Sequence, residues 1–193
     1  MAEIKPLKAW RYNPSISKSI EAVRSPLFDV VSDKQRKALY KNPYSSIHLS
    51  VPQPPDANDR ASTLLKQWKN NGILIQDKLP AIYAYYQYFK VAGFQHEYCR
   101  KGFICNIRAY NWDENIILRH ENTIPKAVND RIELLEKTEL NVSPTHGLYT
   151  DSNFELEKYL DEAIQVPIYE AEDYQGVRDV LGLFMTQRSL KGF

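Results

Sequence analysis

Cysteine, glycine and long hydrophobic runs are all scarce in this sequence of 193 residues. Its two cysteines, Cys99 and Cys105, lie in a segment that we expect to form one strand. Side chains alternate along a strand, so both would share a face, but they would lie too far apart for a disulfide. We therefore expect free thiols in a reduced, cytoplasmic environment. No second Cys/His pair has matching spacing, so we expect no metal site on these cysteines.

Signature motifs of several enzyme classes are missing as well. The chain has seven glycines, and none of them builds a loop that could cradle a phosphate. The patterns HExxH, CxxC and Gly-x-Ser-x-Gly do not occur. These absences argue against P-loop kinases, zincins, thioredoxins and α/β-hydrolases.

The sequence has little net charge and no segment that directs it to a membrane. The net charge is +1, unlike the strongly basic balance of a nucleic-acid binder, so nucleic acid is not an expected partner. No apolar run approaches the roughly 20 residues of a membrane span, and the amino terminus does not resemble a signal peptide. Hydrophobic residues make up 43% of the chain, and we expect residues 1–193 to form a single domain.

Tyrosine, by contrast, is abundant, with 13 residues, and favours β structure. The strongest strand pattern covers residues 81–89, and the chain returns over 98–112 and again over 116–120, which predicts a three-stranded meander. Shorter strands are expected at 7–12, 27–31, 45–51, 73–75 and 146–149, with two more around 174–176. Helices are expected at 15–23, 33–41, 58–71, 125–140 and 154–163. The predicted class is α+β, with a mixed, mainly antiparallel sheet and peripheral helices.

The most informative stretch for function is Arg119-His120-Glu121-Asn122-Thr123, between the expected strand 116–120 and a helix that starts at Pro125. The first N–H groups of a helix lack internal partners and favour an anion. His120 beside Glu121 could act as a general acid or base, or could hold a metal ion. The structural alternative is that His120 ends the strand and Glu121 merely favours the helix dipole.

Three further charged groups accompany this stretch as candidates. Asp130 and Arg131 lie in the second turn of the expected helix. Either Asp130 pairs with Arg119 or Arg131 with Glu121, or Arg131 completes an anion site with the start of the helix. Asp29 interrupts an apolar run and is either bonded to backbone N–H groups or functional. Arg11, at the end of the first expected strand, could converge on the same place.

Several segments resemble an uncharacterised prokaryotic family, the domain of unknown function with the number ten-fifteen. The matching segments are residues 6–11, 28–32, 42–45, 79–85, 100–104, 119–123, 130–135, 141–144 and 176–178. Family members are usually about twice as long, so the resemblance implies that this chain corresponds to the amino-terminal half; residues after Leu181 depart from the family's usual continuation. The family has no established activity to carry over. The organisation of residues 119–131 is also similar to the ParB/sulfiredoxin-like fold, although the glycine-containing motif of that fold is absent.

Two functions follow as hypotheses. In the first, the protein binds or processes a small phosphorylated molecule or nucleotide, with His120, Glu121 and Asp130 as catalytic residues. The other ligand-binding residues would be Arg119, Arg131, Asn122, Thr123, Asp29 and Arg11, and Mg²⁺ is a candidate cofactor. In the second, the protein is a non-catalytic interaction module that uses the tyrosine-rich hairpin 81–110, with a homo-oligomer as one form of partner.

Overall fold

The computed structural model describes residues 2–15 and 19–186, which form helices and antiparallel strands and so confirm the α+β class. The chain divides into two compact units. Unit 1 contains residues 1–11, 76–119 and 149–193, and unit 2 contains residues 12–75 and 120–148. Among the described helices, none combines the length and the hydrophobicity needed to cross a membrane.

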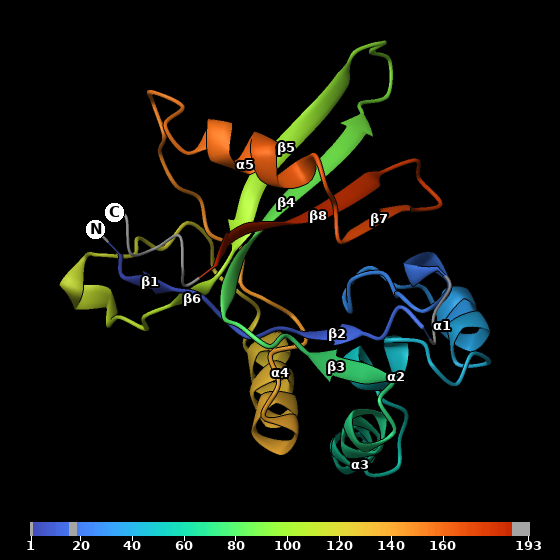
Figure 1. Ribbon diagram of the computed structural model, residues 1–193. Coiled ribbons are helices and arrows are strands. Elements are labelled where there is room, and N and C mark those ends of the chain that lie inside the picture. The colour runs from blue at the N-terminus through green and yellow to red at the C-terminus, as the bar shows by residue number, and fades with distance from the viewer. Residues whose placement is uncertain (1, 16–18, 187–193) are drawn as a thin grey trace. The chain divides into compact units, whose positions relative to one another are not determined.

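Unit 1 is built on a four-stranded sheet with the order β5-β4-β8-β7, in which all neighbours are antiparallel (Figure 1). Its strands are β4 (Ala81–Lys90), β5 (Glu97–Ile104), β7 (Tyr169–Glu172) and β8 (Arg178–Thr186). The predicted strand over 81–89 is therefore confirmed, as are the hairpin that follows it and the pair of strands around 174–176. Two short strands, β1 (Ile4–Lys5) and β6 (Asn106–Ile107), pair with each other.

The core of unit 1 lies between this sheet and helix α5 (Glu157–Ile164), which crosses one face of the sheet (Figure 1). Ala84 and Tyr86 of β4 and Val180 of β8 are buried there against Leu160 of α5. Alternation along the strands puts these residues on one face. The backbone of α5 approaches so closely that a Cβ atom at Gly182 would lie 2.1 Å from the carbonyl oxygen of Ala163. Only glycine fits at this position.

The prediction of a third strand in the meander is wrong. Residues 116–120 form no strand, and the second neighbour of β4 is β8, from the carboxy-terminal part of the chain. Ile116 and Leu118 are 40% and 72% exposed, so this apolar run does not provide the buried face of a sheet. The long strand predicted over 98–112 is also interrupted. Cys105 separates β5 from β6, and both cysteines are free thiols, as expected.

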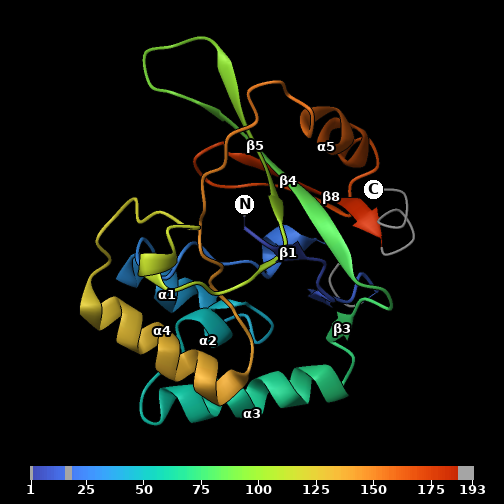
Figure 2. The same cartoon turned by 90° about the vertical axis from the view of Figure 1, so that its left-hand side faces the viewer.

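Unit 2 is mainly helical. Its helices are α1 (Asp33–Leu39), α2 (Ile47–Ser50), α3 (Ala57–Asn70) and α4 (Pro125–Thr138). Helices α3 and α4 lie side by side (Figure 2) and bury Leu65 and Trp68 of the first and Leu134 of the second. The sequence predicted α1, α3 and α4 correctly, including the capping box in which Ser32 and Gln35 bond each other's backbone N–H groups.

Three predicted strands that lie wholly or mostly in unit 2 are wrong. Residues 27–31 form a turn in which Leu27 is 70% and Val30 60% exposed, so the apolar run does not mark a buried strand. Residues 45–51 contain the short helix α2, in which Ile47 and Leu49 are buried although they alternate with polar residues. Residues 146–149 are likewise not a strand. The helix predicted over 15–23 falls partly outside the described residues, and Ile20–Ala22 form a short 3-10 helix, η1.

The remaining elements are short. Strands β2 (Trp10–Tyr12) and β3 (Leu74–Gln76) form a two-stranded sheet, close to the ranges that the sequence predicts. A second 3-10 helix, η2 (Trp112–Glu114), follows β6 and ends at Asn115, whose φ of 53° is left-handed.

Candidate functional site

The candidate stretch enters α4 as an extended loop rather than as a strand. Residues 118–124 have no regular secondary structure, and α4 begins at Pro125 as predicted. Proline suits this first helical position, because the N–H group that it lacks would have no partner within the helix. Arg119 is the last residue of unit 1 and His120 the first of the adjoining segment of unit 2.

The loop of unit 2 presents polar side chains to solvent. His120, Glu121, Asn122 and Thr123 are all exposed. No hydrogen bond joins the side chain of His120, Asn122 or Thr123 to any other described residue. None of these three therefore holds the loop in place through its side chain. They remain available to a ligand, which is what the functional hypothesis for His120 requires.

The amino terminus of α4 offers fewer backbone donors than a typical helix. Its N-cap, Ile124, has no side-chain hydrogen bond to the first turn, and Pro125 has no N–H to give. The N–H of Ala127 already donates to the carbonyl oxygen of Ile124 at 2.9 Å, and Val128 shares the same acceptor at 3.2 Å. Lys126 thus contributes the one backbone donor in this turn that has no partner within the helix. An anion here would depend mainly on cationic side chains.

Arg131 is the best-positioned cation of unit 2. Its Nε and Nη2 donate to Asp130, at 3.0 and 2.5 Å, and its Nη1 donates to the backbone oxygen of Ser50 at 2.6 Å. The guanidinium carbon lies 4.4 Å from the ring centre of Phe28, in a cation–π contact. These contacts use three of the five N–H donors of the guanidinium group. The side chain is 20% exposed, so it keeps partial access to solvent.

Two of the segments that resemble the family, residues 28–32 and 130–135, are therefore in contact in unit 2. Phe28 comes from the turn over residues 27–31, about one hundred positions before Arg131, and Asp29 follows it directly. Asp29 is exposed, and its carboxylate bonds to none of the described residues. The alternative in which backbone N–H groups hold Asp29 thus has no support in this part of the chain. Arg131, in contrast, pairs with Asp130 itself, a partner that the structural alternative did not name.

The two remaining predicted cations belong to unit 1, and each has a local partner. Arg119 lies over the ring of Trp112, with 5.6 Å between the guanidinium carbon and the ring centre. Arg11 donates from Nε to both carboxylate oxygens of Asp77, at 2.9 and 3.0 Å, and from Nη1 to the hydroxyl of Tyr169 at 3.3 Å. A role for Arg11 in ligand binding stays a prediction, but its local geometry is that of a structural ion pair.

The ion pair of Arg11 belongs to a polar cluster that sequence reasoning missed. The hydroxyl of Tyr83 also donates to Asp77, whose side chain is only 14% exposed. Burial acts to raise the pKa of Asp77, but the hydrogen bonds from Arg11 and Tyr83 outweigh it and hold the pKa below its ordinary value. Burial and Asp77 together raise the pKa of Tyr83 to about 12. In the sequence, the only sign of this cluster is that Asp77 precedes Tyr83, in an expected strand, by six residues. Such a spacing is too common to identify a cluster.

In residues 2–15 and 19–186, no group of three or more His, Cys, Asp or Glu side chains is arranged to hold a metal ion. Near the loop, Glu121 and Asp130 are the acidic candidates, and Asp130 already binds Arg131. Mg²⁺ would therefore need oxygen ligands from a bound phosphate as well as from the protein, as is common for this ion.

Sequence reasoning also missed three residues of unit 2 that take part in the candidate site. Phe28 and Ser50 hold Arg131, and Lys126 adds an exposed cation to the first turn of α4. Lys126 could have been found from its place directly after Pro125. The contacts of Phe28 and Ser50 join distant parts of the chain, and no local pattern marks them.

Comparison with known proteins identifies the family but adds no activity. No curated protein matches the chain, and no solved structure matches it either. The likeness to the ParB/sulfiredoxin-like fold therefore has no support from these comparisons and stays a prediction. A family model described as "Protein of unknown function (DUF1015)" matches residues 4–189, and the chain belongs to that family.

Proposed function

We propose that unit 2 binds a small phosphorylated molecule or nucleotide at the loop 120–123 and the first two turns of α4. The observation that carries this proposal is the state of Arg131. It is fixed on three sides by Asp130, Ser50 and Phe28, yet it keeps unused N–H donors and partial access to solvent. A preorganised arginine of this kind suits a phosphate group, because its planar guanidinium group can donate to two phosphate oxygens at once.

The neighbouring residues would supply the other functions of the site. Arg131 and Ile124 are seven positions apart, so about 10 Å separates them along the helix axis, roughly the span of a diphosphate with its sugar. Lys126 would add positive charge near the start of α4. Asn122 and Thr123 would donate or accept hydrogen bonds. His120 would exchange a proton with the ligand if a reaction follows binding.

A thermal-shift screen of nucleotides and phosphorylated metabolites tests this proposal. A ligand at one hundred times its dissociation constant should stabilise the protein by roughly 2.7 kcal/mol, which raises the melting temperature measurably. The Lys126→Ala variant should show a smaller shift. The matched control is Lys34→Ala, which removes another exposed lysine of unit 2 and should leave the shift unchanged. If no compound stabilises the protein at millimolar concentration, the proposal fails.

The second candidate function is an interaction module built on the hairpin 81–110, and one specific observation favours it. Tyr83 and Tyr86 of this hairpin are only 2% and 1% exposed and belong to the core, whereas Tyr98 is 37% exposed. What remains open is the outer edge of β5, because that strand lies at the end of the sheet.

A further inference from the structure

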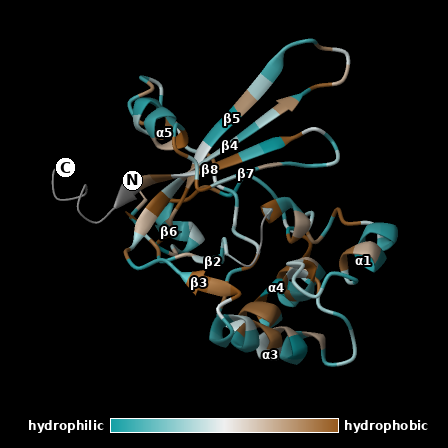
Figure 3. Cartoon of the chain, turned by 45° about the vertical axis from the view of Figure 1, so that its right-hand side comes forward, coloured by the Kyte–Doolittle hydropathy of each residue, from teal (hydrophilic) through white to brown (hydrophobic). Residues whose placement is uncertain are grey.

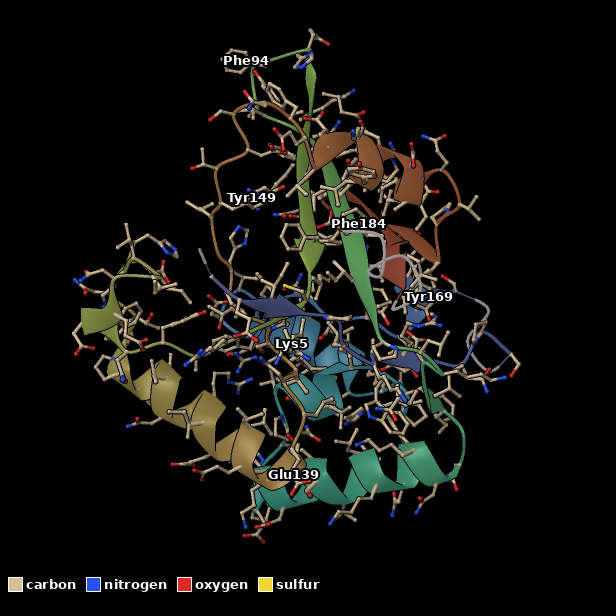
Figure 4. All side chains as sticks on the ribbon, turned by 60° about the vertical axis from the view of Figure 1, so that its left-hand side comes forward. Lys5, Phe94, Glu139, Tyr149, Tyr169 and Phe184 are labelled. Carbon is tan, nitrogen blue, oxygen red and sulfur yellow. The ribbon has the colours of Figure 1, made fainter. Side chains whose placement is uncertain are left out.

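Strand β5 forms an edge of the unit 1 sheet, with β4 on one side and no described strand on the other. Its first four residues, Glu97 to Arg100, are all exposed. The β4–β5 hairpin carries this edge outward beyond α5 (Figure 1), and Phe94, 60% exposed, lies at its tip (Figure 4). Hydrophilic and hydrophobic segments alternate along this projecting part (Figure 3). The unused N–H and C=O groups of such an edge can pair with another strand.

The edge lacks several of the features that prevent pairing. Strand β5 has eight residues, contains no proline, and keeps an unbroken register with β4 from Tyr83↔Ile104 to Lys90↔Glu97. The opposite edge, β7, has only four residues. Protected edge strands are typically short, bulged, interrupted by proline or lined with charged side chains, and of these features β5 has only its charges, Glu97, Arg100 and Lys101. Strand β5 therefore has the length and regularity that strand addition requires.

The residues around Cys99 are complementary to themselves. If a second β5 runs antiparallel with Cys99 opposite Cys99, then Glu97 faces Lys101 of the partner subunit and Tyr98 faces the partner's Arg100. Alternation puts Glu97, Cys99 and Lys101 on one face of the sheet and Tyr98 and Arg100 on the other. On either side of the central Cys99 pair, the register thus joins an acid to a base and an aromatic ring to a guanidinium group, and both kinds of cross-strand pair are favourable.

We propose that two copies of this chain associate through β5, as an antiparallel pair centred on Cys99 that joins the two sheets around a two-fold axis. Such an interface is isologous, so every contact occurs twice. This proposal is independent of the phosphate site in unit 2.

The charges near the axis are compatible with this arrangement. The ammonium group of Lys101 binds the carboxylates of Glu157 and Asp161 within its own chain. An ammonium group has three N–H donors, so one remains for Glu97 of the partner subunit. Arg178 lies over the ring of Tyr88 at 4.0 Å and is paired with Glu170 at 2.9 Å. The paired segment is short, and its contact area falls below the roughly 800 Å² per partner of a standard interface. Association should therefore depend on concentration.

Cysteine cross-linking tests the register directly, because the two cysteines supply a matched pair. In the Cys105→Ser variant only Cys99 remains, and opposite residues of an antiparallel pair have Cα atoms about 4.5–5.5 Å apart, within disulfide range. Copper-catalysed oxidation should convert this variant to a covalent dimer that a reductant dissociates. In the Cys99→Ser variant only Cys105 remains. The two copies of Cys105 would lie on opposite sides of the two-fold axis, twelve strand positions or roughly 40 Å apart, and should not cross-link. Equal cross-linking of the two variants would overturn the proposal.

Sedimentation equilibrium supplies an independent measurement. The wild-type chain should be a monomer–dimer mixture, and Glu97→Lys should weaken the dimer at least tenfold, because it places like charges opposite each other. The control Glu162→Lys makes the same charge change on an exposed residue of α5 and should leave the equilibrium unchanged. Circular dichroism checks that each variant is folded. A wild-type chain that stays monomeric up to roughly 100 µM, which corresponds to a binding free energy of about 5.5 kcal/mol, would overturn the proposal.

Discussion

Two arginines with similar surroundings illustrate how position decides what a residue can do. Arg11 and Arg131 each bind a carboxylate and contact an aromatic ring, and their side chains are 19% and 20% exposed. The partner of Arg11 is itself largely buried, whereas Asp130 is 54% exposed. Removing a buried partner leaves an uncompensated charge in a low dielectric, which is costly. We therefore assign a structural role to the first arginine and propose a binding role for the second.

At the residue scale we predict a pH-dependent effect for Asp77→Asn. The folded pKa of Asp77 lies below its ordinary value of 3.8, so its carboxylate stabilises the fold at neutral pH. That contribution is lost as pH falls through the folded pKa. The variant should lose about 2 kcal/mol of unfolding free energy at neutral pH, and the difference from wild type should shrink as pH falls below about 4. Urea denaturation over a pH series measures both values.

The control for this prediction is Asp113→Asn, which removes an exposed carboxylate of η2 in the same unit. Its unfolding free energy should match wild type at every pH. If the loss for Asp77→Asn is the same at neutral and acidic pH, the ion pair with Arg11 is not its source.

At the scale of elements, local signals predicted what local contacts determine. Ser32 and Gln35 cap α1 through their own backbone, and Pro125 starts α4, so both boundaries could be predicted from sequence. The alternation over 45–51 failed because a one-turn helix can also bury residues two apart, as Ile47 and Leu49 are. The second neighbour of β4 could not be predicted either. It comes from β8, roughly one hundred positions away, and no local pattern specifies which strands pair.

The contact between β8 and α5 leads to the second prediction. Gly182→Ala should destabilise the protein by about 3 kcal/mol, because a Cβ atom would collide with the backbone of α5 at Ala163. Gly102→Ala in β5 is the matched control, since its Cβ would lie 3.9 Å from the nearest atom, the carbonyl oxygen of Tyr85. It should be neutral or slightly stabilising, as alanine restricts the unfolded chain more than glycine does. Urea denaturation of both variants decides; equal losses would show that the approach of α5 is not close in solution.

At the scale of the whole molecule, the chain passes between its two compact units after Arg11, Ile75, Arg119 and Leu148. The candidate stretch spans one of these crossings, so Arg119 and His120, although adjacent in sequence, belong to different units. The sequence motif therefore identified the charged residues, but it could not show which of them belong to the same unit. Sequence placed Asp130 beside Arg131, but the contacts of Arg131 with Phe28 and Ser50 depend on the folded chain.

The proposal of a phosphate site is tested most directly by one variant, His120→Ala, with two properties measured on it. His120 is exposed and bonds to no other described residue, so its removal should change the free energy of unfolding by less than about 0.5 kcal/mol. Binding of the compound that gives the largest thermal shift should weaken at least tenfold, as titration calorimetry can show. Unchanged affinity, or a stability loss of about 1–3 kcal/mol with affinity retained in the folded fraction, would contradict a functional role for this loop.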